Sequence, residues 1–299
     1  MADTPPSFAA ITMTFSTSRA AAVALSVLPR KTMSRALGEI SRLRARGSAL
    51  DWTISLYCRA YDVDLADYEL PVGGFESFDA FFTRRLKPDA RPLDVDASAI
   101  LSPADGRIEA CGLIDDAGKL HIKGSDYTVS ELLGGDVEVS RYQGGQFCVV
   151  YLSPRDYHRV HAPVSGRVVK CQHVDGTLYP VNRIGLSHVS QLFARNERVA
   201  VHQESAAGPI CTVLVGAIGV GHITLDFEPI IATNRGKAPA ERIYAAGEEP
   251  SLSRGEELGV FHLGSTVIVF LGAQEHWNMV VQMGDVVRMG QALARRAAE

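Results

Sequence analysis

Apolar residues recur with a helical period over the first third of the chain, from Ser18 to about Val63. In the segment KTMSRALGEISRLRAR they are three or four positions apart and so share one face of a helix, which carries Met33, Leu37, Ile40 and Leu43. A second amphipathic helix is expected around LDWTISLYCRAY, with Ser48 or Asp51 as its cap. A third is expected in SFDAFFTRRL, beginning at a Ser77 cap. Three helices therefore precede Pro88.

Beyond Pro92 the pattern changes to short runs of β-branched and apolar residues between Gly, Pro and Asp. These runs predict strands, at residues 145–153, 165–174, 209–225 and 259–270. The run at 259–270, GVFHLGSTVIVF, reads as one buried strand interrupted by Gly-Ser-Thr, which is typical of a bulge. The polar, Gly- and Pro-rich segment 228–257 is expected to be a long loop.

A weak internal repeat organises the β-rich part. SPADGRIEA at 102–110 and APVSGRVVK at 162–170 share Pro-x-x-Gly-Arg followed by a β-branched residue, so two related β-units are expected to form a sandwich-like core. GDVVRMGQALA at 284–294 resembles the closing hairpin of lipoyl and biotinyl barrel-sandwich hybrids. We therefore expect an α+β fold, with N-terminal amphipathic helices followed by a β-rich core like a sandwich or barrel-sandwich hybrid. The expected divisions are a disordered tail at 1–17, a helical region at 18–90 and a β-rich domain at 91–299.

Charge and cysteine content limit the possible partners. The net charge of −4 and the pI near 6.1 argue against nucleic-acid binding. Five scattered cysteines without a C-x-x-C pair fit a reducing compartment and suggest no role for themselves. The apolar run at 20–28 is about half the length of a membrane span and lacks the features of a secretory signal, so a cytoplasmic chain is expected.

The first predicted helix is the basic exception in an acidic chain, because residues 30–46 contain six basic residues and one acidic residue. Such a helix can lie in a membrane interface, with its apolar face among acyl chains and its cations over anionic head groups. Alternatively, its apolar face packs on the core and its basic face is solvated. The pattern alone leaves both open.

Three places could carry chemistry. Asp105 lies in the turn SPADG, His158 and His161 follow a predicted strand in YLSPRDYHRVHAP, and Ser265 follows Gly264 in the interrupted strand. Each also has a structural explanation, as a turn, a pair of loop histidines and a bulge. Together they supply a nucleophile, a base and a group that orients the base. A hydroxyl at Ser265 can attack the preceding carbonyl, and Gly264 lets the backbone distort into the required geometry.

Four motifs occur in one order along the chain: SPADG, YLSPRDYHRVHAP, LFARNERV and LGST. In this they resemble phosphatidylserine decarboxylase of the bacterial, membrane-associated type. The resemblance implies a proenzyme that is cleaved between Gly264 and Ser265 into a large chain, 1–264, and a small chain, 265–299. It implies a charge relay in which Ser265 attacks, His161 is the base, and Asp105 orients or polarises His161.

The same resemblance implies the cofactor and the reaction. Ser265 would become a covalent pyruvoyl group, which binds the substrate amine as a Schiff base and accepts the electrons released with carbon dioxide. His158 is the candidate general acid that protonates the resulting carbanion, and the product is phosphatidylethanolamine. His262, two residues before Gly264, is expected to pack neutrally or to tune the cleavage, and Thr266 to help position the attacked carbonyl.

The implied partners are phosphatidylserine, an anionic membrane surface and the two chains of the same molecule, whose further dimerisation stays open. The enzyme would be peripheral, on the cytoplasmic side of the cell membrane, and the helices would dock there. Two other functions compete with this interpretation. One is a zinc hydrolase with His158, His161 and Asp105 as ligands, and the other is a non-enzymatic, lipoyl-like binding module in which Ser265 lies in a bulge.

Overall fold

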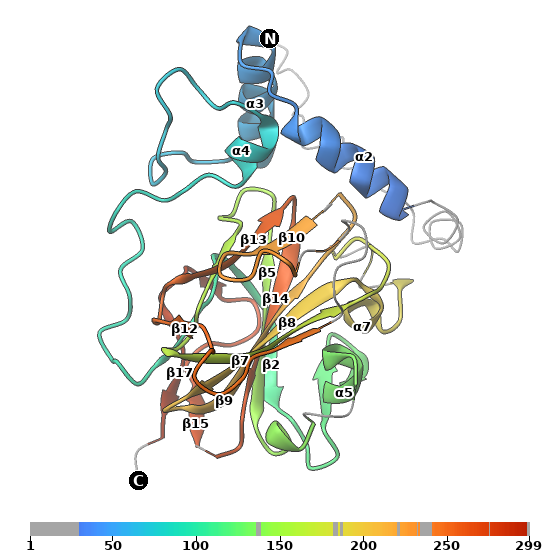
Figure 1. Cartoon of the computed structure of the whole chain (residues 1–299), viewed down its shortest axis with the longest axis vertical. Coiled ribbons are helices and arrows are strands. Elements are labelled where there is room, and N and C mark those ends of the chain that lie inside the picture. The colour runs from blue at the N-terminus through green and yellow to red at the C-terminus, as the bar shows by residue number, and fades with distance from the viewer. Residues whose placement is uncertain are drawn as a thin grey trace, which may run out of the picture.

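The computed structural model describes residues 30–135, 139–181, 185, 188–219, 222–231, 233, 241–274 and 276–297. The tail expected at 1–17 and the beginning of the predicted helical region lie outside these residues. Figure 1 shows the first three helices gathered at one end of the molecule, with the β-rich core beside them. The expected α+β architecture is confirmed.

The three helices are α2 (Arg30–Arg42), α3 (Ser48–Tyr61) and α4 (Phe78–Phe82). The predicted Ser77 cap is confirmed, because its hydroxyl accepts a hydrogen bond from the Ala80 amide at 3.0 Å. The cap predicted for α3 is wrong: Gly47 occupies that position without a side-chain bond, and both Ser48 and Asp51 lie inside the helix. Helix α4 also ends earlier than the apolar pattern suggested, at Phe82.

Helix α2 turns its small residues toward the rest of the protein. Its buried positions are Ser34, Gly38 and Ser41. The predicted apolar face is exposed instead: Ile40 and Leu43 are each 63% accessible. The structure therefore contradicts the alternative in which this apolar face packs on the core.

The core is built on a nine-stranded sheet with the order β11-β7-β8-β9-β14-β5-β2-β16, in which β12 also pairs with β7. Its strands are β2 (Gly106–Leu113), β5 (Gln146–Leu152), β7 (Gly166–Val174), β8 (Arg198–Ser205), β9 (Gly208–Val215), β11 (Glu241–Ile243), β12 (Ser251–Leu252), β14 (Ser265–Leu271) and β16 (Val286–Val287).

Smaller elements complete the core. One three-stranded sheet has the order β10-β13-β6, a second has the order β1-β17-β15, and β3 pairs with β4. The elements are β1 (Ile100–Leu101), β3 (Lys119–Ile122), β4 (Ser125–Thr128), β6 (Arg159–His161), β10 (His222–Leu225), β13 (Glu257–His262), β15 (Trp277–Met279), β17 (Ala292–Arg296), α5 (Val129–Leu133), the 3-10 helix η2 (Val139–Arg141) and α7 (Leu192–Arg195).

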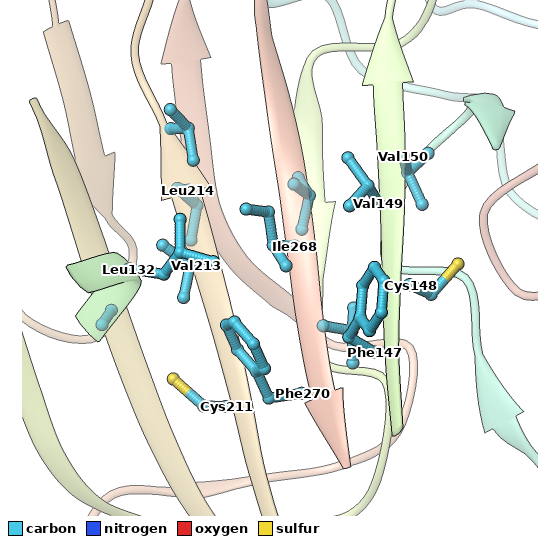
Figure 2. Close-up of a cluster of buried hydrophobic side chains, with 14 of the residues drawn as sticks. Leu132, Phe147, Cys148, Val149, Val150, Cys211, Val213, Leu214, Ile268 and Phe270 are labelled. Atoms are coloured by element: carbon cyan, nitrogen blue, oxygen red, sulfur yellow. The ribbon is translucent and has the colours of Figure 1, made fainter. Parts of the chain in front are cut away.

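Strand β14 lies in the middle of the large sheet, between β5 and β9. Its residues from Val267 to Leu271 are almost fully buried, and Figure 2 shows Ile268 and Phe270 packed among side chains of the neighbouring strands. Burying a large aliphatic or aromatic side chain stabilises a fold by about 1.5–3 kcal/mol. This strand therefore ties the end of the sequence to the central core.

The internal repeat has a structural counterpart. Each copy contributes a strand that begins at its glycine, Gly106 in β2 and Gly166 in β7. The pairing of each strand with its neighbour shifts register at the same point of the repeat, after Ile108 in one copy and after Val168 in the other. The two β-units thus share a β-bulge as well as a sequence pattern.

Four predictions about the β region need correction. The run 209–225 is two strands in different sheets, β9 and β10. The run 259–270 is two strands in different sheets, β13 and β14, because the chain turns between them. The segment 284–294 is no hairpin, since β16 pairs with β2 whereas β17 pairs with β1 and β15. The expected loop 228–257 contains β11 and β12, whose backbone polar groups are satisfied by pairing with β7.

Candidate active site

The predicted cleavage point lies in the turn that separates β13 from β14. Leu263 and Gly264 both have left-handed backbone angles, with φ of 85° and 59°. Glycine adopts this conformation readily, but leucine does so only under constraint from its surroundings. Ser265 follows as the first residue of β14, where its backbone pairs with Leu152 of β5.

A single loop, residues 153–158, reaches both sides of this turn. It leaves β5 directly after Leu152, which pairs with Ser265. It ends at His158, whose carbonyl accepts a hydrogen bond from the Phe261 amide at 3.0 Å. The Asp156 carboxylate stabilises the loop by accepting bonds from the Ser153 amide and hydroxyl, each at 2.7 Å. The predicted His motif is therefore folded against the predicted cleavage point.

His158 is fully buried in this loop, with its ring 4.1 Å from the ring of Phe82. Its Nδ1 lies 2.8 Å from the Asp156 carbonyl, and since a carbonyl can only accept, Nδ1 carries the proton. Its Nε2 is buried and has no hydrogen-bond partner within the described part of the chain. Burial, followed by the charge of Arg84, lowers the pKa of His158 to about 3. At neutral pH, Nε2 is therefore an unprotonated acceptor.

His161 is the last residue of β6, and both nitrogens of its ring form hydrogen bonds. Nδ1 donates to the Gly255 carbonyl at 2.8 Å, and Nε2 accepts from the Tyr157 hydroxyl at 3.0 Å. Burial lowers the pKa of His161, although the Gly255 carbonyl and the charges of Glu257 and Asp105 act in the opposite direction. A neutral imidazole whose Nε2 carries a lone pair in place of a proton is the form that can act as a base, and here that lone pair accepts the Tyr157 hydroxyl.

Asp105 lies close to His161, because the His161 amide donates to the Pro103 carbonyl of the SPADG turn at 2.8 Å. Its carboxylate is bonded elsewhere, to the Arg91 guanidinium at 2.6 and 3.0 Å and to the Met289 amide at 2.8 Å. Within the described residues, no hydrogen bond joins Asp105 to His161. The structure thus brings the two residues near each other, and the charge of Asp105 has a small raising effect on the pKa of His161.

Thr266 follows Ser265 on β14 and is fully buried. Its hydroxyl oxygen has no hydrogen-bond partner among the described residues. A buried polar atom without a partner destabilises a fold by about 1–3 kcal/mol. Thr266 Oγ1 and His158 Nε2 are therefore two unsatisfied groups on segments that adjoin the predicted cleavage point.

Sequence reasoning missed the partners that hold these side chains. Tyr157 was inside a quoted motif, and its place directly before His158 was the available signal. Arg91 precedes Pro92 in a linker, and Phe82 belongs to a helix that was interpreted only as a docking element. No local pattern indicates that these two residues reach Asp105 and His158.

The zinc alternative finds no support in the ligand geometry. Within the described residues, the one group of three possible ligands is His173, Asp175 and Glu197, away from the predicted histidine pair. That group is already engaged: His173 Nε2 lies 2.9 Å from Glu197, and Asp175 forms an ion pair with Lys31.

Among the helices that the structure describes, none has both the length and the apolar composition needed to cross a membrane.

Comparison with known proteins identifies the class. Residues 78–295 match the sequence model of a family described as phosphatidylserine decarboxylase. The chain belongs to the phosphatidylserine decarboxylase family.

Relatives named phosphatidylserine decarboxylase proenzyme align over most of their length. One from Brevibacillus brevis is 40% identical over 275 residues, which cover 91% of this chain and 96% of that protein. One from Bordetella pertussis is 41% identical over 275 residues, with 90% and 92% covered. One from Pseudomonas fluorescens is 41% identical over 276 residues, with 91% and 96% covered.

Proposed function

We propose that the chain is a proenzyme that cleaves itself between Gly264 and Ser265, and that the mature protein decarboxylates phosphatidylserine to phosphatidylethanolamine and carbon dioxide. The observation that carries this proposal is the left-handed turn at Leu263 and Gly264, bracketed by the loop 153–158. At this turn the chain passes from one sheet to another. The bond between Gly264 and Ser265, which the reaction must cleave, lies at the end of the turn.

The self-cleavage requires a base and a nucleophile. His161 Nε2 exchanges the Tyr157 hydroxyl for that of Ser265 and accepts its proton. The Ser265 oxygen attacks the Gly264 carbonyl carbon, so that a C–O bond forms and the peptide C–N bond breaks. Elimination from this ester releases Gly264 as the carboxylate end of the large chain. Hydrolysis of the remaining dehydroalanine then releases ammonia and leaves a pyruvoyl group at position 265. The Asp105 charge supports the step, since it favours the protonated form of His161.

The surroundings of position 265 fit a pyruvoyl group. After cleavage this residue begins the small chain at the start of a paired strand, and the adjoining segments carry two unsatisfied polar atoms, Thr266 Oγ1 and His158 Nε2. When formed, the pyruvoyl carbonyl supplies the electron sink that loss of carbon dioxide requires.

His158 would handle the proton of the reaction. The serine head group arrives as an ammonium ion and must lose a proton before its nitrogen can react. Because the pKa of His158 is about 3, Nε2 holds no proton at neutral pH, so any proton that it later donates must first come from the substrate. The same proton can return to the substrate carbon once carbon dioxide has left. The predicted general acid thus begins the cycle as a base.

We also propose that α2 and α3 dock on an anionic membrane at the cytoplasmic side of the cell. Their exposed apolar side chains include Leu37, Ile40, Leu43, Trp52 and Leu56. Beside them lie the cations of a segment with six basic residues and one acidic residue. An apolar surface flanked by cations suits a bilayer that contains anionic lipids, and a two-tailed lipid substrate requires the enzyme to work at that interface.

Intact mass spectrometry under denaturing conditions tests the central proposal. We expect two chains, 1–264 and 265–299, with the smaller one carrying a pyruvoyl group in place of Ser265. A Ser265→Ala variant should remain one chain and should not release carbon dioxide from phosphatidylserine vesicles. A single intact chain in the active wild-type protein, or cleavage of the Ser265→Ala variant, would refute the mechanism.

A further inference from the structure

The two residues before Gly264, His262 and Leu263, are held by the helices. His262 Nδ1 lies 2.9 and 3.0 Å from the carboxylate oxygens of Asp79, in the first turn of α4. Its Nε2 lies 3.2 Å from the hydroxyl of Thr224 on β10. Because a carboxylate accepts, Nδ1 donates to Asp79, and in the neutral ring Nε2 accepts from Thr224. The His262 ring is thus fixed between a helix of the docking region and a strand of the core.

Leu263 makes the second attachment. Its side chain lines an apolar groove of about 480 Å³, together with Leu37 and Ile40 of α2, Leu50 of α3 and Phe78 of α4. A leucine at φ 85° is strained by about 1–3 kcal/mol and keeps that angle only when its surroundings enforce it. The helices therefore help to hold the backbone of Leu263, on the side of the turn that carries the Gly264 carbonyl.

The helices also hold the loop on the opposite side of the turn. The Tyr57 hydroxyl of α3 donates to the Pro154 carbonyl at 3.0 Å. The Arg84 guanidinium, which follows α4, donates to the Arg155 carbonyl at 3.0 Å. The ring of Phe82 lies against His158. The helical region therefore contacts the turn before Ser265 and the loop 153–158 beside it.

From these contacts we infer that the helices α2 to α4 are part of the maturation machinery, with Asp79, His262 and Leu263 as positioning residues that hold the Gly264 carbonyl for attack. This inference rests on the proposed self-cleavage. It assigns to the helical region a role apart from membrane docking. It also gives His262 a purpose, since a side chain that packed neutrally would not need a carboxylate and a hydroxyl at its two nitrogens.

The rate of self-cleavage measures this role directly. Freshly synthesised full-length proenzyme is sampled over time and quenched in denaturant, and the fraction of small chain is measured by mass spectrometry. We expect His262→Leu and Asp79→Ala to slow cleavage at least about tenfold. His262→Asn should restore most of the rate, because its amide nitrogen can replace Nδ1 as donor to Asp79. The decarboxylation rate per pyruvoyl group should stay unchanged, since these residues act before the mature enzyme exists.

A second His–Asp pair provides the matched control. His121 and Asp126 form an exposed pair at 2.8 Å in the β3–β4 hairpin, so Asp126→Ala should cleave at the wild-type rate. Leu263→Gly extends the test in case His262→Leu does not fold. It permits the same φ without strain but removes the side chain from the groove, so we expect slower cleavage in a protein that is no less stable.

The outcomes separate the inference from the proposed function. If wild-type protein is never cleaved, the proposed function itself is wrong. If wild-type protein is cleaved and the variants at Asp79, His262 and Leu263 mature at its rate, only the positioning role is overturned. Equal loss of rate in His262→Leu and His262→Asn would also contradict the role of the Asp79 hydrogen bond.

Discussion

The protonation state of His158 is set by one backbone carbonyl and by burial. Nδ1 must keep its proton to donate to Asp156, so chemistry at this residue occurs at Nε2. We predict that His158→Gln is still cleaved at Ser265, because His161 is the proposed base for that step. Its decarboxylation rate should fall at least about 100-fold, the usual loss for a missing acid–base group.

The measurement combines mass spectrometry of the purified variant with carbon dioxide release from phosphatidylserine vesicles. His121→Gln, in an exposed hairpin, is the control and should match wild type in both assays. A His158→Gln protein with pyruvoyl and near-normal decarboxylation would exclude this residue from proton transfer.

Thr266 combines full burial with an unpaired hydroxyl. Because valine has nearly the same shape without the polar atom, Thr266→Val should raise the free energy of unfolding by about 1 kcal/mol. If the hydroxyl helps to position the attacked carbonyl, the same variant should also cleave more slowly. Urea unfolding in a Ser265→Ala background gives the first value, and a time course of small-chain release in the wild-type background gives the second. A variant that is stabilised but cleaves normally would leave Thr266 without a role in maturation.

Buried histidines make the fold sensitive to acid. Burial, then the charges of Lys170 and Arg141, lower the pKa of His202 to about 3, and His158 has a similar value. A histidine in the unfolded chain takes up a proton near pH 6.5. Between about pH 6.5 and pH 3 the unfolded state therefore binds more protons, and the free energy of unfolding falls as the pH decreases. Each such histidine contributes about 1.4 kcal/mol per pH unit in this window.

Urea unfolding of the uncleaved Ser265→Ala protein at pH 7.5, 6.5 and 5.5 tests this prediction at His202. His202→Gln should lose about 1 kcal/mol less than its parent between pH 6.5 and 5.5, because the unfolded histidine is already half protonated at pH 6.5, and the difference should be smaller still above pH 6.5. An equal loss in both proteins would show that His202 is protonated in the folded state. His121→Gln serves as the exposed comparison.

At the level of elements, local patterns predicted what local forces determine. Strand β7 agrees with its predicted range to within one residue, because turn residues flank a short run that contains three valines. The run 259–270 was misread because Val260 and Val267 are both buried, although in different sheets. The left-handed angles at Leu263 and Gly264 separate the two strands, and a leucine gives no sign in the sequence of such an angle.

The candidate site was predictable to the same extent. Motifs located Asp105, His158 and His161 because they lie in short segments with distinctive composition. Their partners were not predictable, since Arg91 and Asp79 reach the site through long-range packing that leaves no local periodicity. The exposed face of α2 shows the same limit: its pattern fixed which residues share a face, but the small residues Ser34 and Gly38 decided which face is buried.

The orientation of α2 gives a prediction about membrane docking. Leu37 and Ile40 lie on its exposed face, so replacing both with glutamate removes apolar contact and adds charge without opening the core. We expect Leu37→Glu/Ile40→Glu to bind vesicles of phosphatidylserine and phosphatidylethanolamine at least about tenfold more weakly, with a nearly unchanged urea midpoint. Vesicle sedimentation measures the binding. Val95→Glu, at a fully exposed position outside the helices, is the control. Undiminished binding would mean that another surface meets the membrane.

At the scale of the whole molecule, cleavage would cut the chain without separating its parts. The small chain supplies β14 to β17, and each of β14, β16 and β17 pairs with a strand of the large chain. Strand β14 is enclosed on both sides, by β5 and β9, and forms part of the central core (Figure 2). The two chains should therefore elute together from a sizing column under native conditions.

This arrangement predicts a difference between proenzyme and mature enzyme. Unfolding the mature form releases two chains from one folded unit, so mass action makes its stability depend on protein concentration. Each tenfold increase in concentration should add about 1.4 kcal/mol to the apparent free energy of unfolding. The uncleaved Ser265→Ala protein has the same core but unfolds to one chain, so its urea midpoint should not change with concentration. Equal behaviour of the two forms would mean that the small chain stays attached after unfolding, or that the mature protein has not been cut.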